Sequence, residues 1–187
     1  MRTYRLALFV PVALAALIVS GCGNNDSAKT VAEVFLQATQ QPGPADVPMA
    51  AGGDVTIPTL IITSKAKSPS AVLSQQDDVV LNQWVVTCAR TDGGTVASPS
   101  WQNFETVYVP ANGTANLQNY RIFPAEYFKL APLFQLFPEN GGYDPVTNRS
   151  NIRQRLHVEI FGKTVAGKNI SVAFDVNLNF FYLVNVP

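Results

Sequence analysis

Two neighbouring stretches, RQRLHVEI at residues 153–160 and ISVAFDVNLNF at residues 170–180, decide the fold of this chain. In the later stretch every second residue is apolar, and the residues between are mostly polar. In the earlier stretch Leu156, Val158 and Ile160 alternate with charged or imidazole side chains. A period of two is typical of strands that bury one face and leave the other in water.

The segment GKTVAGKN at residues 162–169 joins these two strands. It is short and carries two glycines, as a hairpin connection does, so we expect an antiparallel hairpin over residues 153–181.

Four less regular stretches precede the hairpin, and their apolar and β-branched residues also favour strands. They cover residues 55–63, 79–90, 106–109 and 117–123. Pro58 places the first of them at a sheet edge or a bulge. Six or seven strands without a long helical period predict an all-β antiparallel sandwich of immunoglobulin-like or fibronectin-like type. Trp84 followed by Cys88 does not reproduce the immunoglobulin cysteine and tryptophan pattern, so only the architecture is implied.

The chain begins with a segment typical of secretion. Arg2 and Arg5 are followed by an apolar run at residues 6–19, broken only by Pro11. A membrane-spanning helix needs about 20 apolar residues, so this run is too short to span and instead predicts a signal peptide.

The motif VSGC at residues 19–22 resembles the lipobox of bacterial lipoproteins. The resemblance implies a lipid on the Cys22 thiol, cleavage before Cys22, acylation of the new amino terminus and a membrane anchor through these acyl chains. Gly23 occupies the position where aspartate would imply inner-membrane retention, so the resemblance favours the outer membrane. The alternative is an ordinary cleaved signal with a chance cysteine. We therefore expect a signal peptide at residues 1–21, a lipidated tether at 22–53 and the sandwich domain at 54–187.

Composition excludes several classes of protein. The 187 residues include 13 basic and 13 acidic side chains, and this zero net charge argues against nucleic-acid binding. One histidine and two cysteines rule out a cysteine-rich zinc module or a disulfide-stapled miniprotein. Lipidation of Cys22 would leave Cys88 without a partner in the chain. We expect Cys88 to be buried and inert, the alternative being a redox-active or intermolecular thiol.

The tether carries a helical pattern. Thr30 and Glu33 have the spacing of a capping box, and four apolar residues share one helical face, so a short N-terminal helix is expected. These residues are Val31, Val34, Phe35 and Ala38. The proline- and glycine-rich residues 40–53 then predict a linker. The apolar face would dock on its own domain or on a partner.

Residues 124–149, called the lobe below, break the strand pattern. Four prolines exclude a long helix, although Pro124 and Glu126 suit a short one over residues 124–130. The large apolar residues of the lobe either fill the core as a crossover segment or form a partner-binding or membrane-touching surface. They are Tyr127, Phe128, Leu130, Leu133, Phe134, Leu136, Phe137 and Tyr143.

No catalytic or metal-binding motif is present. His157 is the only histidine, and strand parity places it beside Arg155 and Glu159 on a polar face, as part of a charged ladder rather than a catalytic triad. The paired Asp77 and Asp78, and Asp144, stand near turns without the spacing of a calcium loop. We therefore expect no metal and no cofactor.

Three functions remain open. We expect a non-catalytic binding or assembly module of the envelope, with a protein partner. A carbohydrate-binding module would stack sugars on an exposed Trp101 beside Tyr108 or Tyr120, whereas Trp84 is expected in the core. A hydrolase would gather carboxylates from separate segments into one pocket. These carboxylates would be Glu126, Glu139 and Asp144.

Overall fold

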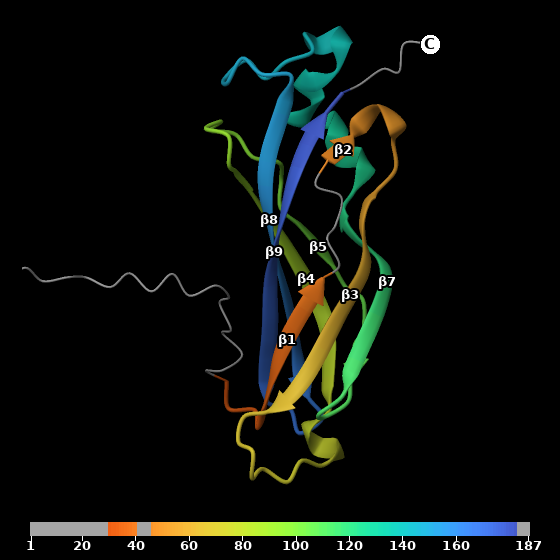
Figure 1. The fold of residues 1–187 in the computed structure, drawn as a ribbon, viewed down its shortest axis with the longest axis vertical. Coiled ribbons are helices and arrows are strands. Elements are labelled where there is room, and N and C mark those ends of the chain that lie inside the picture. The colour runs from red at the N-terminus through yellow and green to blue at the C-terminus, as the bar shows by residue number, and fades with distance from the viewer. Residues whose placement is uncertain (1–29, 41–45, 183–187) are drawn as a thin grey trace, which may run out of the picture.

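The computed structural model describes residues 30–40 and 46–182, which form an all-β fold of two open sheets (Figure 1). The smaller sheet has the order β1 (Val34–Gln40), β3 (Val55–Ala66), β7 (Thr114–Phe123). The larger sheet has the order β2 (Asp46–Pro48), β9 (Asn169–Phe181), β8 (Asn151–Thr164), β4 (Val79–Arg90), β5 (Trp101–Asn103), and β6 (Val107–Val109) also pairs with β4. All pairings are antiparallel except the parallel pair β2–β9. The expected all-β class is confirmed.

The hairpin expected from the alternating stretches is strands β8 and β9. They pair antiparallel from Asn151 opposite Phe181 to Lys163 opposite Asn169. The alternate apolar residues are buried except Phe174, which is half-buried, and Leu156 and Val158 are fully inaccessible. Burial of one face fixes the register, because a slip by one residue would turn every apolar side chain to solvent.

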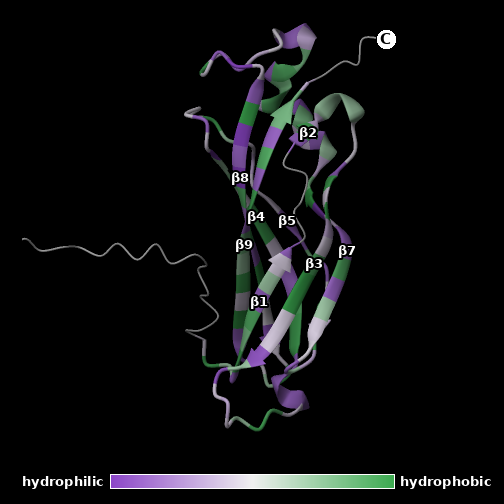
Figure 2. Ribbon diagram, viewed as in Figure 1, coloured by the Kyte–Doolittle hydropathy of each residue, from purple (hydrophilic) through white to green (hydrophobic). Residues whose placement is uncertain are grey.

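One hydrophobic core lies between the two sheets. Ile57 and Leu60 of the smaller sheet and Trp84 and Val86 of the larger sheet are fully buried in the same cluster. The strands accordingly alternate between hydrophobic and hydrophilic residues along their length (Figure 2). Trp84 therefore lies in the core, as expected.

The short helix expected within residues 30–38 is wrong, because Val34–Gln40 is strand β1 and pairs with β3 along its whole length. Val34, Leu36 and Ala38 also satisfy a period of two, and Val34 and Leu36 are fully buried. Tertiary burial of these residues outweighs the weak local helical preference. Strands β1 and β2 both lie within residues 22–53, and they pair with β3 and β9, so part of the segment expected as tether and linker belongs to the two sheets.

Strand β3 is central in the smaller sheet, so of the two expected settings for Pro58, an edge or a bulge, the edge is excluded. The pairing between β3 and β7 joins Thr59 to Gln118 and Ile57 to Tyr120. Asn119, the residue between those two partners, has a φ of 52°. The missing N–H of Pro58 is therefore accommodated by a local irregularity in β7 instead of an edge position.

The lobe is a chain of three 3-10 helices, η4 (Ala125–Lys129), η5 (Leu133–Leu136) and η6 (Pro138–Asn140). Phe128, Leu133 and Leu136 are at most 4% exposed and belong to the core. The Phe128 ring lies 5.9 Å from Phe123 and 6.2 Å from Phe180, measured between ring centroids. The core-filling interpretation therefore holds for these residues.

Two further 3-10 helices are η2 (Met49–Ala51) and η3 (Gln75–Asp77). None of the helices in the described part of the chain has the length and apolar character needed to cross a membrane.

A buried ionic triad fastens the lobe to the larger sheet. The guanidinium of Arg90, at the end of β4, contacts Asp92 at 2.7 Å and Asp144 of the lobe at 2.6 Å. The side chains of Arg90, Asp92 and Asp144 are at most 3% exposed. Asp92 also accepts a hydrogen bond from the main-chain N–H of Arg153 on β8 at 2.8 Å. Three segments distant in sequence are thus joined by one cation.

Candidate functional site

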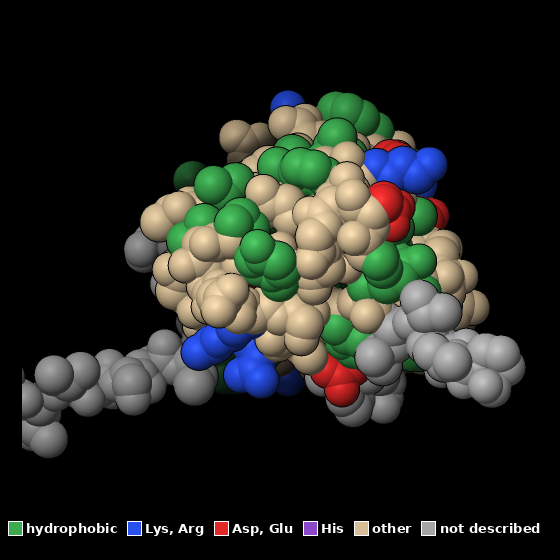
Figure 3. All heavy atoms as spheres, turned by 90° about the horizontal axis from the view of Figure 1, so that it is seen from above, with side chains coloured by type: hydrophobic (Ala, Val, Ile, Leu, Met, Phe, Trp, Pro, Cys, Tyr) green, Lys and Arg blue, Asp and Glu red, His purple; other side chains and the backbone are tan. Residues whose placement is uncertain are grey.

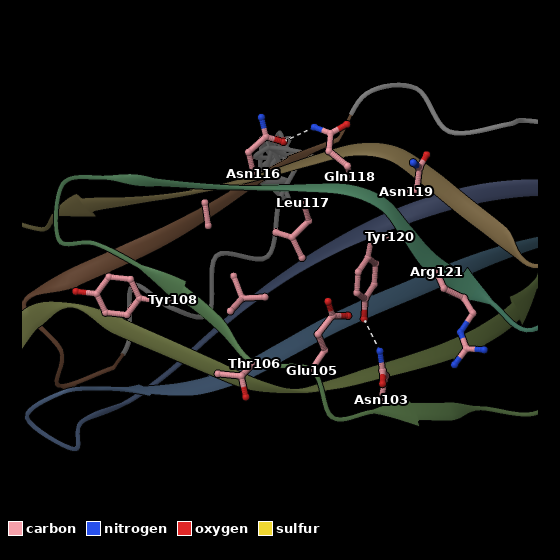
Figure 4. A pocket seen from close by; sticks show the side chains of 12 residues that line it. Asn103, Glu105, Thr106, Tyr108, Asn116, Leu117, Gln118, Asn119, Tyr120 and Arg121 are labelled. Carbon is pink, nitrogen blue, oxygen red and sulfur yellow. Dashed lines mark hydrogen bonds between the residues drawn. The ribbon is translucent and has the colours of Figure 1, made fainter.

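The two sheets are in contact along one side of the molecule, and a groove opens between parts of their edges along the other. On the closed side, β1 lies against β9, and the Gln40 side-chain amide donates to the Asp175 carbonyl oxygen at 2.8 Å. On the open side, β7 ends the smaller sheet, and β5 and β6 end the larger one. A groove of about 710 Å³ lies between these edges (Figure 4), within the range of about 300–1,000 Å³ found for ligand sites. We call it the seam groove.

The seam groove is lined mainly by polar residues, with a small apolar strip at its centre. Ala115 and Leu117 of β7 are half-buried, and Val107 of β6 is 7% exposed. Leu117 and Tyr120 point into the groove in Figure 4. Tyr120 stacks on Trp84, with ring centroids 4.1 Å apart. The groove therefore reaches the hydrophobic core of the domain.

The connection between β5 and β6 forms one border of the groove, and two side-chain hydrogen bonds fix its position. The indole N–H of Trp84 donates to the Glu105 carbonyl oxygen at 2.9 Å, and the Asn103 side-chain amide donates to the Tyr120 hydroxyl at 3.5 Å. Within this connection the exposed Glu105 points into the groove towards Tyr120 in Figure 4, whereas Phe104 is 73% exposed and does not line the groove. A carboxylate is thus presented in the groove, on a turn that the hydrogen bond from Trp84 holds in place.

Tyr108 lies at one end of the groove and is fixed by a buried acid. Its hydroxyl donates to the Asp78 carboxylate, which also accepts from the Ala111 N–H at 2.7 Å. The hydrogen bonds from Tyr108 and Ala111 lower the pKa of Asp78, and the same contact raises the pKa of Tyr108. The ring is therefore positioned as a neutral phenol, 53% exposed as a residue.

The opposite border of the groove is β7, and its outward side chains are mainly uncharged amides. Gln118 donates to Asn116 at 2.8 Å and accepts from the Thr59 hydroxyl at 3.2 Å. Arg121 lies 3.4 Å from Asp54 and its guanidinium carbon lies 5.5 Å from the centre of the Trp101 ring. Asn116 and Gln118 point away from the groove (Figure 4).

The main chain of β7 has one free edge. The Ser64 N–H donates to the Gly113 carbonyl oxygen at 2.9 Å, and the register then places Ala115 and Leu117 opposite Ile62 and Leu60. Hydrogen-bonding direction alternates along an antiparallel strand. The N–H and C=O groups of Thr114, Asn116 and Gln118 therefore point away from β3, and β7 pairs with no other described strand.

The prediction that Trp101 is exposed is wrong. Trp101 lies in β5, is 7% exposed, and donates its indole N–H to the Ile122 carbonyl oxygen at 3.0 Å. The Trp101 ring packs in the hydrophobic core, and the Arg121 guanidinium lies over one of its faces. Tyr120 is also buried, so Trp101 and Tyr120 offer no platform for a sugar ring.

The six lobe residues expected to bind a partner are divided by the structure. Phe128 and Leu133 are buried and cannot contact a partner, because the core surrounds them. Tyr127 and Phe137 pack partly against the core, and Phe134 is half-buried. Tyr143 is 48% exposed, together with two other apolar residues of the lobe, Leu130 and Val146.

Hydrophobic side chains gather over the end of the molecule that carries the lobe (Figure 3). This end lies opposite the start of β1, at the other extreme of the long axis (Figure 1).

The carboxylates considered for hydrolysis have different roles. Glu126 and Glu139 are exposed on η4 and η6, whereas Asp144 is buried and bonded to Arg90. Burial favours a raised pKa for Asp144, but the hydrogen bonds from Arg90, Thr147 and Val146 outweigh it and lower the pKa. Asp144 is therefore held as a structural anion.

The remaining titratable candidates are likewise structural or solvated. His157 is on the outer face of β8, where its Nδ1 lies 2.7 Å from Asp175 of β9, and both side chains are more than 40% exposed. Asp77 caps η3, and no group of three metal-binding side chains occurs among residues 30–40 and 46–182. Cys88 is half-buried and burial raises the pKa of its thiol to about 12, while Cys22 lies outside the described residues.

The fold and the seam groove define the class of this protein as an all-β domain with an open side. No protein-family model matches the chain, and no curated protein is significantly similar to it. Sequence reasoning named Tyr108 and Tyr120 but missed Asn103, Phe104 and Glu105. The available signal was the uncharged, amide-rich run at residues 116–119, which follows a turn and lacks the charges that usually protect an edge strand.

Proposed function

We propose that this protein is a lipid-anchored, non-catalytic binding module of the bacterial envelope, and that the seam groove is its binding site. The observation that carries the proposal is the groove itself, an opening of about 710 Å³ that reaches the core between two sheet edges. Glu105, on the turn held by Trp84, and the anchored Tyr108 ring border it with groups suited to binding.

The anchor follows from the lipobox-like motif. Cys22 would carry the lipid and Gly23 favours the outer membrane, so the acyl chains would hold the module at the membrane and the segment before β1 would give it reach. Tethering raises the effective concentration of a module towards membrane-bound partners. An envelope protein is therefore the proposed partner.

The two-layer arrangement also supports an immunoglobulin-like or fibronectin-like sandwich as the finer fold type. Its support is the antiparallel pairing of both sheets around Trp84, with loops collected at the two ends of the strands. The position of the carboxylates favours binding over hydrolysis, because Glu126 and Glu139 are solvated and Asp144 is neutralised by Arg90.

The anchor and the groove are tested separately. Cys22→Ala should release the protein from membranes in cell fractionation, and unchanged membrane association would contradict the lipid anchor. For the groove, a photo-crosslinking amino acid placed at Phe104 in living cells should capture a defined envelope protein.

A matched control places the same crosslinker at Thr87, an exposed residue of β4. The Phe104 adduct should also disappear when Ala115→Trp fills the groove. Equal capture from both positions, or capture that persists with the filled groove, would show that the groove is not the binding site.

A further inference from the structure

We propose that the seam groove binds an extended polypeptide segment of its partner, which adds as a fourth strand to the smaller sheet along the free edge of β7. This inference rests on the proposed binding role of the groove and names the class of ligand. The smaller sheet has three strands and ends at β7, and the seam groove lies between β7 and β6. One more strand beside β7 would lie across the mouth of the groove.

The main chain of β7 is ready for such pairing. Thr114, Asn116 and Gln118 each direct one N–H and one C=O away from β3. A segment of about five residues, roughly 17 Å long, would match this run at the usual strand rise. Strand addition of this kind obtains its affinity from main-chain hydrogen bonds and its specificity from alternate side chains.

The free edge lacks the usual protection against pairing. Edge strands normally carry lysine, proline or an inward-pointing charge, or are very short. Residues 114–118 (TANLQ) contain no charge and no proline, within a strand of ten residues. The irregularity at Asn119 ends the regular run, so pairing would be confined to this segment.

The groove also specifies which side chains the added segment should carry. Alternate side chains of the new strand would point inward, towards Ala115, Leu117 and Val107, and apolar groups suit this surface. Glu105 is exposed and forms no salt bridge with any residue of the described ranges 30–40 and 46–182. A basic side chain on the added segment could therefore pair with this carboxylate. The expected ligand is an alternating apolar and polar segment with one lysine or arginine.

A single segment fits the groove better than a second copy of this chain. Two copies pairing through β7 would direct their small inward residues, such as Ala115, into their own cores and would leave both grooves unfilled. A separate segment can supply larger inward side chains and fill the space.

The experiment uses a phage-displayed library of random dodecapeptides, selected on purified full-length protein in mild detergent. We expect enrichment of alternating sequences with one basic residue. A synthetic peptide of the enriched sequence, labelled with a fluorophore, then serves as the probe for binding measured by fluorescence polarisation.

The decisive variants separate main-chain from side-chain recognition at one position. Asn116→Pro removes an outward N–H that β3 does not use, whereas Asn116→Ala removes only the amide side chain. We expect the proline variant to weaken binding at least about tenfold and the alanine variant to change it less than about threefold. Glu105→Gln should lower the affinity for the basic peptide and reduce its salt dependence.

Circular dichroism and urea denaturation show whether Asn116→Pro is folded. If it is not, Gln118→Pro and Ala115→Trp are used in its place. Three results would overturn the inference. They are no peptide enriched over the Ala115→Trp protein, equal losses with Asn116→Ala and Asn116→Pro, and self-association that Asn116→Pro abolishes. In each case crosslinking from Phe104 in cells reports independently whether the groove binds an envelope protein by another mode.

Discussion

Replacing Arg90 by methionine should destabilise the domain, because Arg90 is the only cation within the buried triad. Methionine retains an unbranched apolar side chain of related length but leaves Asp92 and Asp144 without a counter-charge. The guanidinium contacts at 2.7 Å and 2.6 Å would both be lost, in a place where the acid side chains are 1% exposed.

The magnitude follows from the cost of leaving a buried charge unpaired. Removing one partner of a buried ion pair typically costs about 3–5 kcal/mol. Asp92 would keep the Arg153 and Gly94 N–H groups, at 2.8 Å and 3.1 Å, and Asp144 would keep the Thr147 hydroxyl at 2.7 Å. We therefore expect a loss near the lower limit, about 3 kcal/mol, and a decrease in Tm of roughly 6–12 °C.

The triad also predicts the pH dependence of stability. Burial would raise the pKa of Asp92, but hydrogen bonds from Arg90, Arg153 and Gly94 outweigh it and lower the pKa from 3.8 to about 2. A carboxyl group with a lowered pKa in the folded state stabilises the fold above its unfolded pKa, and this contribution disappears as pH falls through the folded pKa. The stability difference between wild type and Arg90→Met should thus narrow between about pH 4 and pH 2.

Urea denaturation followed by tryptophan fluorescence measures both effects, since Trp84 and Trp101 are both buried. Arg121→Met is the matched control, because the Arg121–Asp54 pair has side chains 45% and 37% exposed and should contribute less than about 1 kcal/mol. A loss below about 1 kcal/mol for Arg90→Met, or a difference that stays constant down to pH 2, would refute the role given to the triad.

Three other substitutions or reactions test the packing. Gly162→Ala should destabilise the domain by about 1–3 kcal/mol in urea denaturation, because the added Cβ would clash with the Val80 carbonyl oxygen; a neutral effect would contradict the close approach of β4 and β8. Phe128→Ala should cost about 3–5 kcal/mol by the same assay while Tyr143→Ala changes stability by less than about 0.5 kcal/mol, and similar losses would mean that the two rings are not buried differently. The Cys88 thiol should react with iodoacetamide far more slowly at pH 8 than a free thiol, since burial raises its pKa to about 12; rapid alkylation of the folded protein would show an accessible thiolate.

The strand pairs that sequence predicts best are those with long, uninterrupted alternation. In β8 and β9 the register, the faces and the turn all follow from one pattern, because the side-chain period of a strand is two. In β1 the same reasoning failed, since Val34 and Phe35 with Ala38 also fit a helical face. Only pairing with β3 decides between the two periods, and this pairing is a long-range contact that a short window of sequence does not contain.

The candidate site could be predicted only in fragments. The sequence singles out Tyr108, Tyr120 and Trp101 as aromatic candidates. Only Tyr108 is exposed, whereas Tyr120 and Trp101 are buried, and composition does not reveal this difference. The three-residue strands β5 and β6 are too short for a periodic signal, and the groove arises from where β6 and β7 end their respective sheets. Sheet order is a property of topology, so no local motif announces it.

The open side and the uncharged edge of β7 are best understood together. A free strand edge without charge, proline or cover is a risk for aggregation, and proteins normally protect such an edge. Here the edge borders a groove in which the apolar Ala115 and Leu117 are only half-buried, and one added segment would both pair with the edge and cover these side chains. The Phe104 turn is fixed by a hydrogen bond from the buried Trp84, so the shape of the groove is set before any ligand binds. A preformed groove lowers the entropic cost of binding an extended segment. This favours the interpretation of the groove as a binding site over its interpretation as a packing defect.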